Sequence, residues 1–107
     1  MEKPDKSVAD EIRQQWPNIS RHLSTVPSQH RGEFMDNKLA DAAHKAMCEK
    51  LALSRKKGRG GWWQSECSTE LLKDMLKEHI EKGDMRDVLN LAAMIYFREA
   101  AEIEDTK

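Results

Sequence analysis

The chain has 107 residues, which is enough for one domain of ordinary size and too few for two. Hydrophobic residues make up 38% of the sequence and charged residues 35%, so we expect a small core beneath a highly charged surface. The formal net charge is −1, which argues against a protein that coats nucleic acid through bulk charge but permits a local basic patch.

The sequence also bears on location. No apolar run approaches the length of a membrane span, and the first residues lack the apolar core of a signal peptide. Cys48 and Cys67 form no disulfide framework pattern, so a reducing compartment is the simpler expectation. We therefore expect a cytoplasmic protein with no membrane partner.

A helical pattern runs from Asp5 to about Val26. Its apolar residues recur at steps of three or four: Val8, Ile12, Trp16, Ile19 and Leu23. Pro17 lacks a backbone donor and disfavours helical angles at the residue before it, so we expect a break or kink there. Residues 26–32 have a loop composition. We therefore expect an N-terminal helical arm and loop over residues 1–32 and a helical core domain over residues 33–107.

The next helix is predicted from about Glu33 to Lys57. One face carries its apolar residues: Met35, Leu39, Ala42, Ala43, Ala46 and Leu53. Three basic residues in the last turn suit the negative end of the helix dipole, and Gly58 is a natural stop. A short glycine-containing connector then leads to Trp62 and Trp63.

Two more helices are predicted to form a tight hairpin. Ser68 is a good N-cap for the first, Gly83 ends it, and Asp84 caps the second with Asp87 in the capping-box position. An apolar stripe marks each helix: Leu71, Leu72, Met75, Leu76, His79 and Ile80, then Val88, Leu89, Leu91, Ala92, Ile95 and Tyr96. The second helix is apolar on two faces, which favours a homodimer through these last two helices. The predicted fold is all-α with about four helices.

Four carboxylates flank the predicted turn: Glu78, Glu81, Asp84 and Asp87. Hard cations such as Mg²⁺ prefer oxygen ligands and are often held by a few carboxylates together with substrate phosphates. An antiparallel hairpin could bring the two pairs together around one ion. The alternative is that these acids simply cap and solvate the helix ends, as aspartates at a helix N-terminus commonly do.

A resemblance to a known family covers the segment from about Lys50 to Arg98. It is carried by Lys50-Leu51-Ala52, Lys57-Gly58, Gly61-Trp62, Cys67-Ser68, Glu70, Leu71-Leu72 and Glu78-His79-Ile80-Glu81. These residues resemble the MazG-like nucleotide pyrophosphohydrolases, especially short phage-borne members. The resemblance implies an all-α fold in which Glu78 with Glu81, and Asp84 with Asp87, bind Mg²⁺. It also implies hydrolysis of a nucleoside triphosphate between the α and β phosphates.

A second hypothesis comes from how this chain departs from that family. The family places a dozen or more residues between the two acid pairs, whereas only Lys82 and Gly83 separate them here. Asp84 also stands where the family has Glu, and His79 where it has a second Glu. These differences favour a non-catalytic phage-type interaction protein, an inhibitor or adaptor that binds a host protein through its helical faces and tryptophans.

The basic and aromatic segment from Arg55 to Trp63 supports two further interpretations. In the nucleotide hypothesis, Lys57 and Arg59 contact phosphates, Trp62 stacks on the base, and Asn90 completes the nucleotide-binding set. The same segment could instead bind a nucleic-acid strand locally, which is the third hypothesis. The structural alternative is a capped helix end followed by tryptophans that anchor the core, one buried and one exposed.

Overall fold

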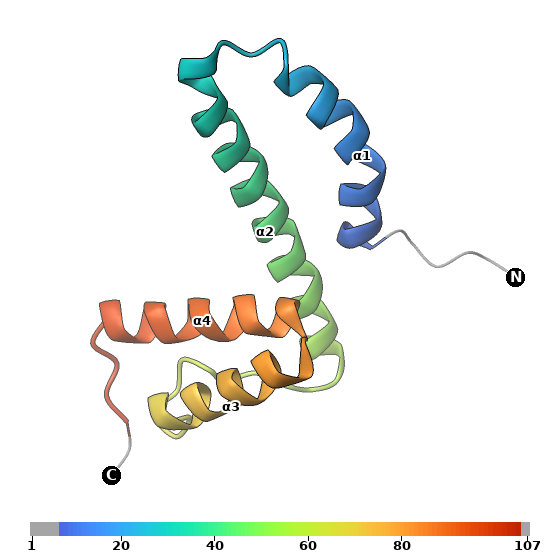
Figure 1. Ribbon diagram of the computed structural model, residues 1–107. Coiled ribbons are helices and arrows are strands. Elements are labelled where there is room, and N and C mark those ends of the chain that lie inside the picture. Colours follow the sequence, from blue (N-terminus) through green and yellow to red (C-terminus); the bar gives the residue numbers. More distant parts are fainter. Residues whose placement is uncertain (1–6, 106–107) are drawn as a thin grey trace, which may run out of the picture. The chain divides into compact units, whose positions relative to one another are not determined.

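The computed structural model describes residues 7–105, and every regular element in that range is a helix (Figure 1). Their order is α1 (Val8–Leu23), the short 3₁₀ helix η1 (Ser28–His30), α2 (Arg31–Lys56), α3 (Thr69–Lys82) and α4 (Met85–Ala100). The prediction of an all-α fold with about four helices is confirmed. Within the described residues, no helix is both long and apolar enough to cross a membrane.

The chain forms two compact units, residues 1–49 and residues 50–107, and α2 contributes to both. The division expected from the sequence, after residue 32, lies before most of α2. The boundary in the structure follows residue 49, so residues 31–49 of α2 lie in the same unit as α1. The backbone N–H of Val8 donates to Oε2 of Glu49 at 2.9 Å, which ties the beginning of α1 to α2.

The first helix begins at a complete capping box. The Ser7 side chain accepts from the Asp10 backbone N–H, and the Asp10 carboxylate accepts from the Ser7 backbone N–H. The expected helix start at Asp5 lies outside the described residues. Of the break or kink expected at Pro17, the break is wrong, because α1 continues through this residue to Leu23. Pro17 is exposed, so water can solvate the carbonyl that its missing N–H leaves without a helical bond.

The helix α2 ends at Lys56, shortly before Gly58, the stop that the sequence predicts. Gly58 adopts the left-handed conformation with φ of 77°, as a C-terminal stop requires. The N–H of Arg59 then donates to the carbonyl of Ser54 at 2.9 Å, and that of Gly58 to the carbonyl of Arg55 at 3.0 Å. These bonds satisfy carbonyls of the last turn and turn the chain into the connector that carries the two tryptophans.

The last two helices pack side by side as the expected hairpin (Figure 1). Ser68 caps α3 by accepting from the Leu71 N–H at 3.0 Å, and Gly83 ends it with φ of 75°. The buried core between the two helices consists of Leu72, Leu91 and Ile95. Partly buried residues pack against this core: Cys67, Met75, Leu76 and Met94.

The buried face of α4 differs from the stripe that the sequence indicates. Leu91 and Ile95 are buried as expected, but Tyr96 is 76% exposed and Leu89 is also exposed. Polar residues take their place, because Asn90 and Arg98 are buried on the same helix. Dimerisation through the last two helices stays a prediction.

Candidate functional site

The unit formed by residues 50–107 contains a hollow of about 590 Å³. Its walls come from the end of α2, the tryptophan connector and the facing sides of α3 and α4. One side is apolar, with Met75, Leu91 and Met94 among its lining residues. The other groups are arginines near the connector and a polar set of side chains at the α3–α4 turn. The hollow is of the size that holds a small organic ligand, and it offers such a ligand both apolar and charged contacts.

The polar set consists of His79 and Asp87, and these two form a cluster with Asp84, which is not among the lining residues. Nδ1 of His79 lies 3.6 Å from Oδ2 of Asp84 and 3.5 Å from Oδ2 of Asp87. One ligand atom from each residue lies within 4.8 Å of the other two, a spacing that a single metal ion could bridge. Nδ1 is shielded from solvent and makes no hydrogen bond. A shielded imidazole nitrogen that faces two carboxylates is an arrangement that a bound cation would complete.

The tight turn at Gly83 creates this cluster. The Asp84 N–H donates to the carbonyl of His79 at 3.0 Å, which closes the end of α3 directly onto the beginning of α4. Asp84 stands at the N-cap position of α4, but its side chain makes no capping hydrogen bond. Its carboxylate lies beside His79 instead. Asp87, one turn further along α4, faces the same imidazole.

The two carboxylates of the cluster influence each other. Burial raises the pKa of Asp87, and hydrogen bonding with the Asp84 side chain raises it further. The same interaction lowers the pKa of Asp84, because a protonated Asp87 donates to its carboxylate. Nζ of Lys50 lies 3.5 Å from Oδ2 of Asp87, so a positive side chain already approaches the cluster from the end of α2. Any added cation would share Asp87 with Lys50.

Arg98 binds the backbone of the tryptophan connector. This guanidinium is fully buried, and its Nη1 donates to the backbone oxygens of Trp62 at 2.8 Å and Gln64 at 3.0 Å. Nε donates to the Thr69 hydroxyl at 3.1 Å, and Nη2 to Asp105 at 2.6 Å. Almost all the donors of the group are therefore engaged, which explains how a charged residue can be buried here.

The two tryptophans differ in their surroundings. Trp62 is half-buried, and its ring meets those of Trp63 and Phe97 edge to face, with centroids 5.7 Å and 5.2 Å apart. Trp63 is 54% exposed. We expected one tryptophan to be buried and the other exposed. Trp62 is only half-buried, but it is the less exposed of the two.

The structure brings together some of the residues singled out from the sequence and leaves others apart. Asp84 and Asp87 meet in the cluster, whereas Glu78 and Glu81 are exposed on α3 and do not belong to it. Three of the expected nucleotide-binding residues line the hollow: Arg59, Trp62 and Asn90. Lys57 is exposed and is not among the lining residues.

Two residues that shape the candidate site do not stand out as such in the sequence. His79 was interpreted as a core residue of the α3 stripe, although its five-residue spacing from Asp84 across a glycine places it beside the aspartates. Arg98 was not singled out. The available signal was its position three residues after Ile95, on the face that Leu91 and Ile95 bury.

No known protein family, curated protein or solved structure matches the chain. The resemblance to the MazG-like pyrophosphohydrolases therefore stays a prediction. Function has to be argued from the hollow and its polar cluster.

Proposed function

We propose that residues 50–107 bind a nucleoside phosphate together with a divalent cation. The observation that carries this proposal is the convergence on one hollow of arginines, tryptophans and two members of the cluster, His79 and Asp87, with Asp84 beside them. Each group suits a different part of a nucleotide. Guanidinium groups pair with phosphates, aromatic rings stack on bases, and carboxylates hold cations that phosphates also bind.

The phosphates are assigned to Arg55 and Arg59, which both line the hollow beside the connector. The base is assigned to Trp63, which has exposed ring surface, whereas Trp62 is engaged by two aromatic neighbours. This differs from the sequence-based assignment of the stacking role to Trp62. Asn90 is buried and lines the hollow, where its amide can donate to or accept from a polar group of the ligand.

The cation is assigned to His79, Asp84 and Asp87. A bound cation would neutralise phosphate charge and polarise the phosphoryl group. Two carboxylates with substrate phosphates are a usual environment for Mg²⁺, while an imidazole nitrogen suits Mn²⁺ and other transition metals better. The cluster therefore fits a divalent cation, and its donor set favours Mn²⁺ over the Mg²⁺ expected from the sequence.

The reaction class that accompanies this proposal is pyrophosphohydrolysis, which rests on the MazG-like resemblance. Water would add to the α phosphorus, and the bond from that phosphorus to the α,β-bridging oxygen would break. The products would be a nucleoside monophosphate, pyrophosphate and a proton. Nucleotide binding does not depend on this step, so a binding protein without turnover remains within the proposal.

The test is a thermal-shift screen of nucleoside triphosphates with Mg²⁺ or Mn²⁺, followed by a pyrophosphate-release assay on each nucleotide that shifts the melting temperature. We expect a shift only when nucleotide and cation are both present. Asp87→Asn should abolish it, and Glu81→Gln, which removes an exposed carboxylate outside the cluster, should retain it. Absence of any shift in the wild-type protein would remove the proposal. Loss of the shift in Glu81→Gln or Glu78→Gln would instead restore the four-acid site expected from the sequence.

A further inference from the structure

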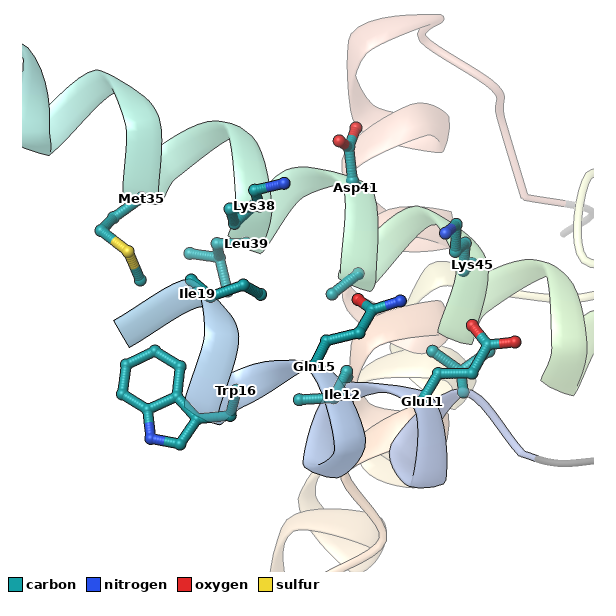
Figure 2. Close-up of a pocket in the computed structure, with 12 residues that line it drawn as sticks. Glu11, Ile12, Gln15, Trp16, Ile19, Met35, Lys38, Leu39, Asp41 and Lys45 are labelled. Atoms are coloured by element: carbon teal, nitrogen blue, oxygen red, sulfur yellow. The ribbon is translucent and has the colours of Figure 1, made fainter. Parts of the chain in front are cut away.

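An apolar groove of about 320 Å³ lies between α1 and the first part of α2, within residues 1–49 (Figure 2). Trp16 and Ile19 of α1 face Met35 and Leu39 of α2 across it (Figure 2). Both helices are amphipathic, and each presents its apolar stripe to the groove. The two stripes enclose open space rather than a packed core, because the groove retains this volume between them.

The apolar residues of the groove are unusually exposed. Leu39 is 70% exposed, Trp16 50% and Ile12 45%. Among residues 7–49, no side chain is buried. A helical hairpin without a single buried side chain gains too little hydrophobic free energy to offset the entropy lost on ordering, and a contiguous apolar surface of this kind marks an interaction site.

The charges on the groove indicate what covers it. Its lining includes two acidic residues, Glu11 and Asp41, and two lysines, Lys38 and Lys45. A groove that accepts a basic or an acidic peptide would carry one sign of charge along its edges. A balanced set of both signs suits a partner with the same surface, because a two-fold axis can place the acids of one copy near the lysines of the other.

We propose that this groove binds a second copy of the chain. The α1–α2 hairpins of two copies then pack groove to groove as a four-helix bundle, which is a common way for two-helix units to bury their apolar faces. This interface is separate from the α3–α4 surface that the sequence favoured for dimerisation. It is also independent of the nucleotide proposal, which concerns residues 50–107.

Sedimentation equilibrium of the full chain tests the proposal with two matched variants. Leu39→Lys places a charge in the groove at a position that is largely exposed, so the helix itself should tolerate it. We expect it to raise the dissociation constant of the dimer by about thirtyfold or more, as loss of a central interface residue does. Tyr96→Lys, at a comparably exposed position on α4, should leave the dissociation constant unchanged.

A charge exchange gives a second, more specific readout. Lys38→Glu with Lys45→Glu makes the groove acidic, and Glu11→Lys with Asp41→Lys makes it basic. Each double variant should be monomeric alone while keeping the wild-type circular dichroism spectrum. An equimolar mixture of the two should form a one-to-one dimer, because opposite charges then meet across the interface.

Three results would overturn the proposal. The first is a wild-type chain that remains monomeric at about 100 µM, a concentration at which even a weak dimer of micromolar affinity forms. The second is a dimer that Tyr96→Lys disrupts and Leu39→Lys does not, because the interface would then lie on α4. The third is a pair of charge variants that dimerise as well alone as they do when mixed.

Discussion

Arg98 and Trp62 are joined by a hydrogen bond of 2.8 Å between Nη1 of the buried guanidinium and the backbone oxygen of Trp62. The bond connects α4 to the connector on which both tryptophans stand. The same guanidinium reaches Asp105 beyond the end of α4, so one side chain fixes three segments of residues 50–107. One wall of the candidate site therefore depends on a residue that does not line the hollow.

Arg98→Met tests this dependence. The substitution keeps the length of the side chain but leaves the backbone oxygens of Trp62 and Gln64 without their donor, so we expect the free energy of unfolding to fall by about 2–3 kcal/mol. Urea denaturation followed by circular dichroism measures the change. Lys77→Met, on the exposed surface of α3, is the control and should stay within about 0.5 kcal/mol of the wild type. Equal stability of the two variants would show that the Arg98 contacts contribute little.

Acid should weaken the same linkage through Asp105. A hydrogen bond from the Thr69 backbone N–H lowers the pKa of Asp105 below its ordinary value of 3.8, and Arg98 lowers it further. A carboxyl whose pKa is depressed by folding contributes stability above its unfolded pKa and loses it as the pH falls through the folded value. We therefore expect Asp105→Asn to be less stable than the wild type at pH 7, with the difference shrinking as the pH falls below 3.8 and through the lowered pKa of Asp105. Stability measured from pH 7 to pH 2.5 checks this. A difference that persists at the lowest pH would point to packing rather than charge.

Gly83→Ala should be destabilising for a backbone reason alone. A Cβ at Gly83 would meet no atom within 4 Å, but the residue has φ of 75°, which side chains with a Cβ rarely adopt. We expect a loss of about 1–2 kcal/mol in unfolding free energy, and weaker cation binding because the turn sets the spacing of His79 and Asp84. Gly60→Ala is the control, since Gly60 has neither a positive φ nor a nearby atom. If Gly60→Ala proves the more harmful change, the turn does not hold the hairpin as we infer.

The two tryptophans should separate binding from stability. We expect Trp63→Ala to lower nucleotide affinity by about tenfold, the usual effect of removing a stacking ring, with little change in unfolding free energy. Trp62→Ala should instead lower stability by about 2–3 kcal/mol, because its ring packs against Phe97. Nucleotide titration by fluorescence quenching and urea denaturation of both variants measure the two effects. An unchanged affinity in Trp63→Ala would remove the base contact from the proposed site.

Local chemistry made several elements predictable from the sequence. Gly58, Ser68 and Gly83 each end or begin a helix as their residue types indicate, because a left-handed angle or a capping oxygen needs only neighbouring residues. The helix does not break at Pro17, because a single lost hydrogen bond on an exposed helix face is tolerated.

The burial of Arg98 and the surroundings of Asp84 could not be predicted, because both depend on residues that are distant in the sequence or on another helix. Arg98 is buried because its partners include Trp62 and Thr69, which lie 36 and 29 residues away along the chain. Such pairings have no local signal. Asp84 stands at the expected N-cap position, but its side chain has surroundings on another helix that local sequence does not indicate. Its residue type and position fit an N-cap, but a histidine on the preceding helix lies close enough for the carboxylate to face it instead.

The most direct test of the central claim is a calorimetric titration of a nucleoside triphosphate into the full chain with Mn²⁺ present. The wild-type protein and Glu81→Gln should bind with the same affinity, and Asp87→Asn should show no heat of binding while keeping the wild-type circular dichroism spectrum. Omitting the cation should abolish binding in the wild-type protein and in Glu81→Gln. Equal binding by Asp87→Asn, or no binding by the wild type, would contradict the claim and leave His79, Asp84 and Asp87 as an ion-pair network with Lys50 that supports the hairpin alone.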